Sequence, residues 1–226
     1  MRYKRAKIDS LNLSAEQLEA VFIYHQDYSV QTVKSKAVFS PILWSDAFGQ
    51  SLKQNIKEAK IIHTYLGLRL PLKTFSVTPN RQTLEFAGLH GYNERSRLLL
   101  QTFRELENQL MYARVTRIDI ALDYLEEIPK GIIKALSKNR KPFRYGLTTY
   151  WKTPKEKGAN QKMDIKIYNK FKKEKIKNDD VVMRLEFVFK GSYLKGYKLK
   201  DLDKLSEKIQ KSIKKATGVS VKIEKI

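Results

Sequence analysis

The chain has 226 residues, 42% of them hydrophobic, and carries 45 Lys and Arg against 24 Asp and Glu, a formal net charge of +21. The absence of cysteine excludes disulfides and thiolate metal sites, and three scattered histidines (His25, His63 and His90) offer little for a zinc site. The excess of positive charge indicates a polyanionic partner, with nucleic acid as the first candidate and an acidic membrane surface or a merely solvated surface as alternatives.

The first ninety residues indicate a meander of strands interrupted by one helix. Alternation of apolar and polar residues predicts strands over 19–30, 61–70, 73–79 and 82–89. Ser45 is a candidate cap for a helix that runs to about Lys60. The apolar residues of this helix, at helical spacing, are Phe48, Leu52, Ile56 and Ala59.

The rest of the chain alternates helices and strands. Asn93 caps a predicted helix whose apolar residues are Leu99, Phe103, Leu106 and Leu110. A strand over 115–124 follows, then a short helix from Pro129 to about Ser137. Further strands are predicted over 146–151, 163–169 and 181–189, and a last helix begins at Asp201 and ends near Gly218.

Together these elements predict an α+β fold, with a central, mainly antiparallel sheet and helices packed on one face. We expect one domain over residues 1–200 and a helical C-terminal appendage over 201–226. The sequence has no run of 18 or more apolar residues, and its first ten residues are too polar for the apolar segment of a secretion signal. Neither membrane insertion nor export is therefore expected, and the predicted location is the cytoplasm.

Three of the predicted strands have the same kind of polar face. In "RIDIALDY" (117–124), the apolar residues alternate with Arg117, Asp119 and Asp123, and successive side chains of a strand point to opposite faces. The same rule applies to "MDIKIYNK" (163–170) and "RLEFVF" (184–189). If the three strands are neighbours, one open face collects Asp119, Asp123, Asp164, Glu186, Tyr168, Arg117, Arg184, Lys166 and Lys170.

This set of side chains is what metal-assisted attack on a phosphodiester needs. Carboxylates hold Mg²⁺ or Mn²⁺, cations balance the charge of the transition state, and a tyrosine whose pKa is lowered can be the nucleophile. Tyr168 is the first candidate nucleophile, and Tyr124, on the apolar side of its strand, is the rival. The alternative is a set of cross-strand ion pairs, each contributing about 0.2–1 kcal/mol.

At these strands the chain resembles plasmid rolling-circle replication initiators of the Rep-trans type and the related relaxases of conjugative elements. The matching segments are "LEFAGLHG" (84–91), "RIDIALDY" (117–124), "IKIYNKFKKEK" (165–175) and "RLEFVF" (184–189). Filamentous-phage replication proteins have a similar set of strands. The resemblance implies a replication-initiator-like fold and a site-specific nick in one DNA strand, after which a tyrosine keeps the 5′ phosphate.

The resemblance also implies roles for individual residues. Tyr168 would be the nucleophile, with Lys166 and Lys170 steadying the scissile phosphate, and Asp119 and Glu186 would bind the metal, with Asp123 as a third ligand. Residues expected to contact DNA are Arg117, Arg184, Lys152, Lys155 and Lys157, the last three from the loop over 152–162. The expected partner is origin DNA, single-stranded or supercoiled, and a homodimer and a helicase partner are open alternatives. The competing hypothesis is a basic nucleic-acid-binding regulator without catalysis.

Overall fold

A computed structural model describes residues 6–16, 18, 27–39, 53–63, 69–75, 78–89, 93–138, 140–151, 163–174 and 182–226. The chain forms two compact units. The first comprises Met1–Leu11, Ala87–His90 and Val115–Ile226, and the second comprises Asn12–Phe86 and Gly91–Arg114. The last helix belongs to the first of these units, and the domain boundary at residue 201 stays a prediction.

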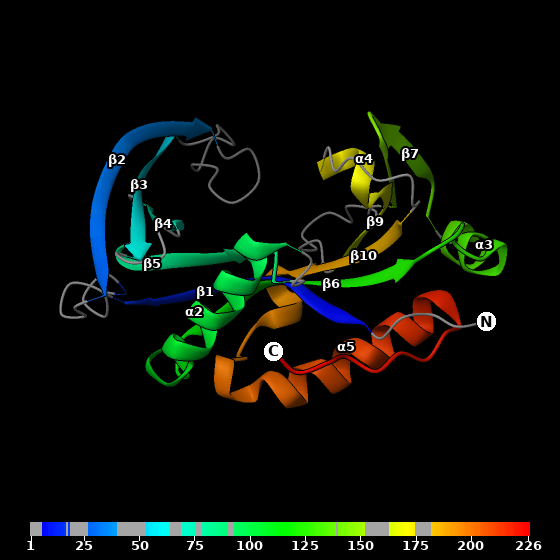
Figure 1. The fold of residues 1–226 in the computed structure, drawn as a ribbon. Coiled ribbons are helices and arrows are strands. Elements are labelled where there is room, and N and C mark those ends of the chain that lie inside the picture. Colours follow the sequence, from blue (N-terminus) through cyan, green and yellow to red (C-terminus); the bar gives the residue numbers. More distant parts are fainter. Residues whose placement is uncertain are drawn as a thin grey trace, which may run out of the picture. The chain divides into compact units, whose positions relative to one another are not determined.

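The second unit contains an antiparallel meander and one long helix (Figure 1). Strand β1 (Lys7–Glu16) begins in the first unit and ends in this one. The strands of the meander, in sheet order, are β2 (Tyr28–Phe39), β3 (Lys53–His63), β4 (Arg69–Phe75) and β5 (Thr78–Ala87). Each pairs with the next in antiparallel register, so a meander is present, but its strands differ from the predicted ones: the range 61–70 includes the end of β3 and the start of β4, and the range 73–79 includes the end of β4 and the start of β5.

Helix α2 (Glu94–Leu110) is the predicted helix after Asn93. The Asn93 side chain accepts a hydrogen bond from the Ser96 backbone N–H at 2.9 Å, and the Asn93 N–H donates to the Ser96 hydroxyl at 3.1 Å. This reciprocal cap satisfies donors that the first turn leaves without partners. The buried stripe of α2 includes Leu99, Leu106, Leu110 and Phe103, whose ring meets the edge of Phe86 at a centroid distance of 5.2 Å.

The predicted helix over 45–60 is wrong where the structure describes it, because residues from Lys53 onward form β3. Ile56, Ile61 and Ile62 are β-branched, which favours extended backbone, and β3 pairs on both sides, with β2 and with β4. Pairing with two neighbours outweighed the helical spacing of the apolar residues. The predicted strand over 19–30 overlaps β2 only from Tyr28 onward, and residues 19–26 lie outside the described part.

The sheet of the first unit has the strand order β1-β6-β10-β9-β8-β7. The strands not yet introduced are β6 (Arg114–Tyr124), β7 (Pro142–Tyr145), β8 (Thr148–Trp151), β9 (Met163–Asn169) and β10 (Met183–Lys190). Strand β10 lies between β6 and β9 and is antiparallel to both. The three strands with polar faces are therefore neighbours.

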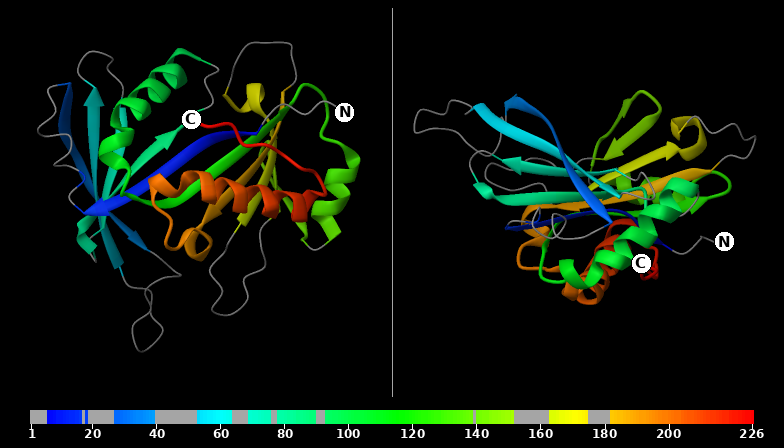
Figure 2. Two further views of the ribbon diagram at one scale, coloured as in Figure 1. Left: turned by 90° about the horizontal axis from the view of Figure 1, so that it is seen from below. Right: turned by 60° about the vertical axis from the view of Figure 1, so that its left-hand side comes forward.

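The helices of the first unit are α3 (Lys130–Lys138), α4 (Lys170–Glu174) and α5 (Leu202–Thr217), with short 3₁₀ turns η1 (Gly191–Leu194) and η2 (Leu199–Asp201). Helix α5 lies across one face of β6 and β10 (Figures 1 and 2) and buries Leu205, Ile209 and Ile213. It ends at Gly218, whose φ of 76° is left-handed, as predicted for its C-cap. No helix in the described part of the chain combines the length and apolar character needed to cross a membrane.

Candidate functional site

The register of β6, β10 and β9 brings the predicted polar residues together in two rows across the sheet. In one row, Glu186 of β10 lies opposite Lys166 of β9. In the next, Arg184 of β10 lies opposite Asp123 of β6 on one side and Tyr168 of β9 on the other. Side chains at paired positions project to the same face, so these residues share one surface of the sheet.

Glu186 is the centre of the first group of contacts. Its Oε2 accepts a hydrogen bond from the Tyr168 hydroxyl at 2.7 Å, and its Oε1 accepts one from Lys166 Nζ at 2.5 Å. Burial by itself raises the pKa of Glu186, but the charge and hydrogen bond of Lys166, with the Tyr168 hydroxyl, outweigh it and lower the pKa to about 2. Glu186 is therefore ionised and tied to a phenol and an ammonium.

Asp119 is the second carboxylate of this group. Arg117 holds it in a two-pronged pair, Nε to Oδ1 at 2.8 Å and Nη2 to Oδ2 at 2.6 Å, and Lys166 Nζ lies 4.0 Å from Oδ2. Burial raises the pKa of Asp119 to about 6 in spite of Arg117, and the charge of Glu186 adds to the increase. Lys166 thus lies within 4.0 Å of both carboxylates.

Arg184 forms a second group that the sequence did not predict in full. Its side chain is fully buried and donates to both oxygens of Asp123, at 2.7 and 2.8 Å, and to Asp9 Oδ1 at 2.5 Å. Burial lowers the pKa of Arg184, but the hydrogen bonds and charges of Asp123 and Asp9 reverse this and raise it. Asp9 was missed because strand β1 was not predicted, and its sequence gives no regular alternation, since Asp9 lies on the same side of the strand as Leu11 and Leu13.

The polar face is buried, whereas the sequence predicted an open one. Asp119, Glu186 and Tyr168 are each no more than 4% exposed. Helix α4, which was not predicted, begins two residues after Tyr168, and Lys173 Nζ lies 3.8 Å from the centroid of the Tyr168 ring. Burial raises the pKa of the Tyr168 phenol, and the negative charge of Glu186 raises it further, so the phenol is protonated in this arrangement.

The other predicted site residues lie in different surroundings. Lys170 is buried at the start of α4. The Arg117 side chain is 42% exposed, so it is accessible to an external phosphate, whereas Arg184 is not. The predicted DNA-binding residues Lys152, Lys155 and Lys157 lie outside the described residues, as does His90.

The donor chemistry of Asp119 and Glu186 fits a divalent cation. Within the described ranges, no cluster of three or more His, Cys, Asp or Glu side chains is placed to hold a metal ion. Mg²⁺, however, is often bound by one or two carboxylates together with substrate phosphates. The ammonium of Lys166, which lies within 4.0 Å of both carboxylates, marks a position that already attracts positive charge. Asp123 differs, because the arginine that engages both of its oxygens, Arg184, is fully buried, whereas Arg117 beside Asp119 is 42% exposed.

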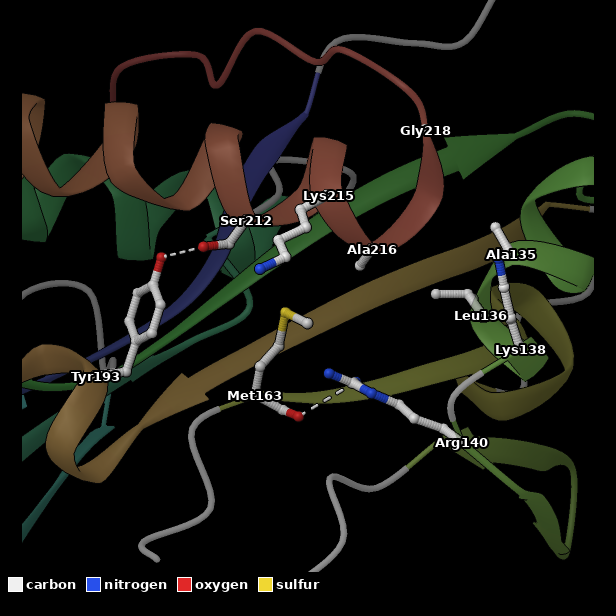
Figure 3. A pocket seen from close by; sticks show the side chains of 10 residues that line it. All are labelled: Ala135, Leu136, Lys138, Arg140, Met163, Tyr193, Ser212, Lys215, Ala216 and Gly218. Atoms are coloured by element: carbon white, nitrogen blue, oxygen red, sulfur yellow. Dashed lines mark hydrogen bonds between the residues drawn. The ribbon is translucent and has the colours of Figure 1, made fainter.

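A cavity of about 540 Å³ lies on the other face of this sheet, between α3, β9 and α5 (Figure 3). Met163 lines it, and Met163 and Tyr168 are five residues apart in β9, so their side chains point to opposite faces. Lys138, Arg140 and Lys215 give the cavity a basic lining, and burial lowers the pKa of Arg140. The cavity is separate from the carboxylate group.

Comparison with known proteins supports the fold. No protein-family model matches the sequence, and no curated protein is detectably similar to it. Among solved structures, a rolling circle replication initiator protein from Geobacillus stearothermophilus has a similar fold, with a TM-score of 0.51 and 14% sequence identity over 91% of this chain and 80% of that one. The similarity confirms the predicted α+β, replication-initiator-like fold.

Proposed function

We propose that this protein initiates rolling-circle replication by nicking one strand of DNA and keeping the 5′ phosphate on Tyr168. The observation that carries the proposal is the position of the Tyr168 hydroxyl, 2.7 Å from Glu186 and on the sheet face that also holds Asp119 and Lys166. The fold of the Geobacillus stearothermophilus initiator and the charge of +21 also support it.

The step is a transesterification at phosphorus. The Tyr168 oxygen attacks the scissile phosphate, a new P–O bond to the phenol forms, and the bond between phosphorus and the 3′ oxygen breaks. The phenol proton leaves to solvent while Glu186, whose Oε2 accepts the phenol hydrogen bond, stays ionised and holds the oxygen in place, and the 3′ oxygen leaves as a hydroxyl with a proton from solvent. A polymerase would then extend this 3′ hydroxyl, and reversal of the step would rejoin the strand.

Positive charge has to lower the pKa of Tyr168 during the reaction, because burial and Glu186 raise it in the arrangement described above. A Mg²⁺ or Mn²⁺ ion held by Asp119 and Glu186 would supply that charge and stabilise the transition state. Lys166 and Lys173, which lie next to Glu186 and to the Tyr168 ring, would balance the phosphate charge. Lys170 remains a predicted phosphate contact, and Asp123 a predicted third ligand.

The proposed partner is DNA, recognised at an origin. Arg117, partly exposed beside Asp119, and Lys173, exposed beside the Tyr168 ring, are the site cations that we expect to meet the scissile strand first. From the family resemblance we predict that the origin belongs to a plasmid or to a conjugative element. A homodimer and a helicase partner are further predictions from the same resemblance.

One observation favours the alternative, a nucleic-acid-binding protein without catalysis. Tyr168 is only 4% exposed, and its hydroxyl is engaged in a hydrogen bond to Glu186, which also accepts a hydrogen bond from Lys166. In that case the buried network would only stabilise the sheet, and basic residues elsewhere would bind DNA.

A nicking assay separates the two functions. Supercoiled DNA with the origin, incubated with the protein and Mn²⁺, should give nicked circles with protein attached to the 5′ end. Tyr168→Phe should abolish nicking and adduct while DNA affinity stays within about twofold, and Tyr124→Phe, the control for the rival nucleophile, should retain both. Nicking by Tyr168→Phe would reject the nucleophile, and DNA binding without nicking by the unmodified protein would favour the alternative.

A further inference from the structure

The β7–β8 hairpin exposes an unusual concentration of large apolar side chains. Among the described residues, five large hydrophobic side chains are exposed, and three of them lie on this hairpin: Phe143 (42%), Tyr145 (79%) and Leu147 (57%). The rings of Phe143 and Tyr150 stack, with centroids 5.2 Å apart and planes 14° from parallel. Clustered exposed apolar residues mark a binding surface more often than scattered ones do.

The register places these aromatic residues on the same sheet face as the candidate active site. Phe143 pairs with Tyr150, which pairs with Lys166 of β9, in the row that contains Glu186. Tyr145 pairs with Thr148, which pairs with Tyr168. Neighbouring strands lie about 4.8 Å apart, so β7 lies roughly 10 Å from the strand of Tyr168.

The charge of the hairpin suits an anionic partner. Between Glu127 and Glu156 the sequence contains no Asp or Glu, and Arg140, Lys141 and Arg144 lie within or next to β7. Aromatic rings beside cations and without carboxylates match a strand of nucleic acid, whose bases stack while its phosphates need positive charge. A second copy of the same hairpin would instead bring like charges together.

We propose that the aromatic face of the β7–β8 hairpin, formed by Phe143, Tyr145 and Tyr150, is a stacking platform for unpaired bases beside the nicked bond. This inference rests on the proposed function and makes it more specific, because bases can stack on the platform only where the DNA is single-stranded. Strand β7 lies at the edge of the sheet, so a DNA strand can approach it from solvent. The substrate is therefore an unpaired segment at the origin.

The test is binding of a fluorescent single-stranded oligonucleotide and of its duplex, by anisotropy, without divalent metal so that no cleavage occurs. Tyr145→Ala should weaken single-strand binding by roughly 5- to 150-fold and leave duplex binding unchanged. Tyr145→Phe keeps the ring and should retain affinity. Tyr112→Ala removes another exposed aromatic side chain, which is 61% exposed, and is the matched control.

Two results would overturn the platform. One is unchanged single-strand affinity in Tyr145→Ala, and the other is an equal loss for duplex and single strand. If sedimentation showed that Tyr145→Ala instead dissociates a dimer without loss of DNA affinity, the hairpin would be a protein interface. Because binding is measured without cleavage, these outcomes are independent of whether Tyr168 is the nucleophile.

Discussion

Removal of the Asp123 carboxylate tests whether Arg184 is a buried structural cation or a residue that meets DNA. Arg184 is fully buried and donates three hydrogen bonds, two to Asp123 and one to Asp9. Loss of one partner from a buried ion pair costs about 3–5 kcal/mol, because the remaining charge stays desolvated. Asp9 still accepts one bond in Asp123→Ala, so we expect the free energy of unfolding to fall by about 3 kcal/mol.

Urea unfolding followed by Trp151 fluorescence measures this loss. The chain has two tryptophans, and Trp151 is buried in the first unit, so a Trp44→Phe background makes the signal specific. Asp203→Asn is the control, since it breaks an ion pair with Lys225 in which both side chains are largely exposed. An exposed pair of this kind contributes about 0–1 kcal/mol.

Equal losses in Asp123→Ala and in the control would refute the buried structural role of Arg184.

The same variant, Asp123→Ala, tests the predicted role of Asp123 in metal binding. If the only role of Asp123 is to pair with Arg184, Asp123→Ala should bind Mn²⁺ with the affinity of the unmodified protein. Titration calorimetry measures this affinity at a urea concentration too low to unfold the variant. A loss of Mn²⁺ affinity together with normal stability would instead support Asp123 as a ligand.

The carboxylate pair and the last helix give three further expectations. Mn²⁺ affinity should fall by up to about tenfold per pH unit below pH 6, because Asp119, with a pKa of about 6, must lose its proton to bind metal. In calorimetric titrations, Asp119→Asn should bind Mn²⁺ more weakly and should lose this pH dependence. Glu186→Gln should lower the pKa of Asp119 in carboxyl carbon NMR, since the charge of Glu186 raises it; an unchanged pKa would contradict their proximity. Gly218→Ala should lower the free energy of unfolding by about 1 kcal/mol in calorimetry, because a φ of 76° is strained for alanine; a more stable variant would contradict the left-handed cap.

Alternation along single strands predicts from the sequence which polar residues of the site share a face of their strand. This works because a strand that is apolar on one face must direct its polar residues to the other. Strands β6, β9 and β10 have this pattern, so the sequence predicts that Glu186, Lys166, Asp119 and Tyr168 share one face if the three strands are neighbours, which they are. The pairing itself is non-local. Only the register shows that Glu186 is opposite Lys166 and that Tyr168 lies opposite Arg184.

Other features were beyond such local patterns. Strand β1 lacks a regular alternation of apolar and polar residues, so Asp9 and its bond to Arg184 could not be foreseen. Strand β3 has apolar residues at helical spacing, and only its pairing with two neighbours decides that it is extended. Burial of the polar face depends on the segments that pack over it, for example α4, whose Lys173 lies beside the Tyr168 ring. The residue pattern of a single strand does not predict such packing.

The site's own charges nearly cancel, so most of the charge that attracts DNA lies elsewhere. Its four carboxylates are Asp9, Asp119, Asp123 and Glu186, and its five nearby cations are Arg117, Lys166, Lys170, Lys173 and Arg184. Nearly all of the excess of +21 therefore comes from residues outside the site. Added salt should weaken DNA binding through released counterions, while the buried pairs are screened far less. If the proposed reaction takes place, variants of the basic residues outside the site should mainly change DNA affinity, and variants of Glu186 or Tyr168 should mainly change the reaction.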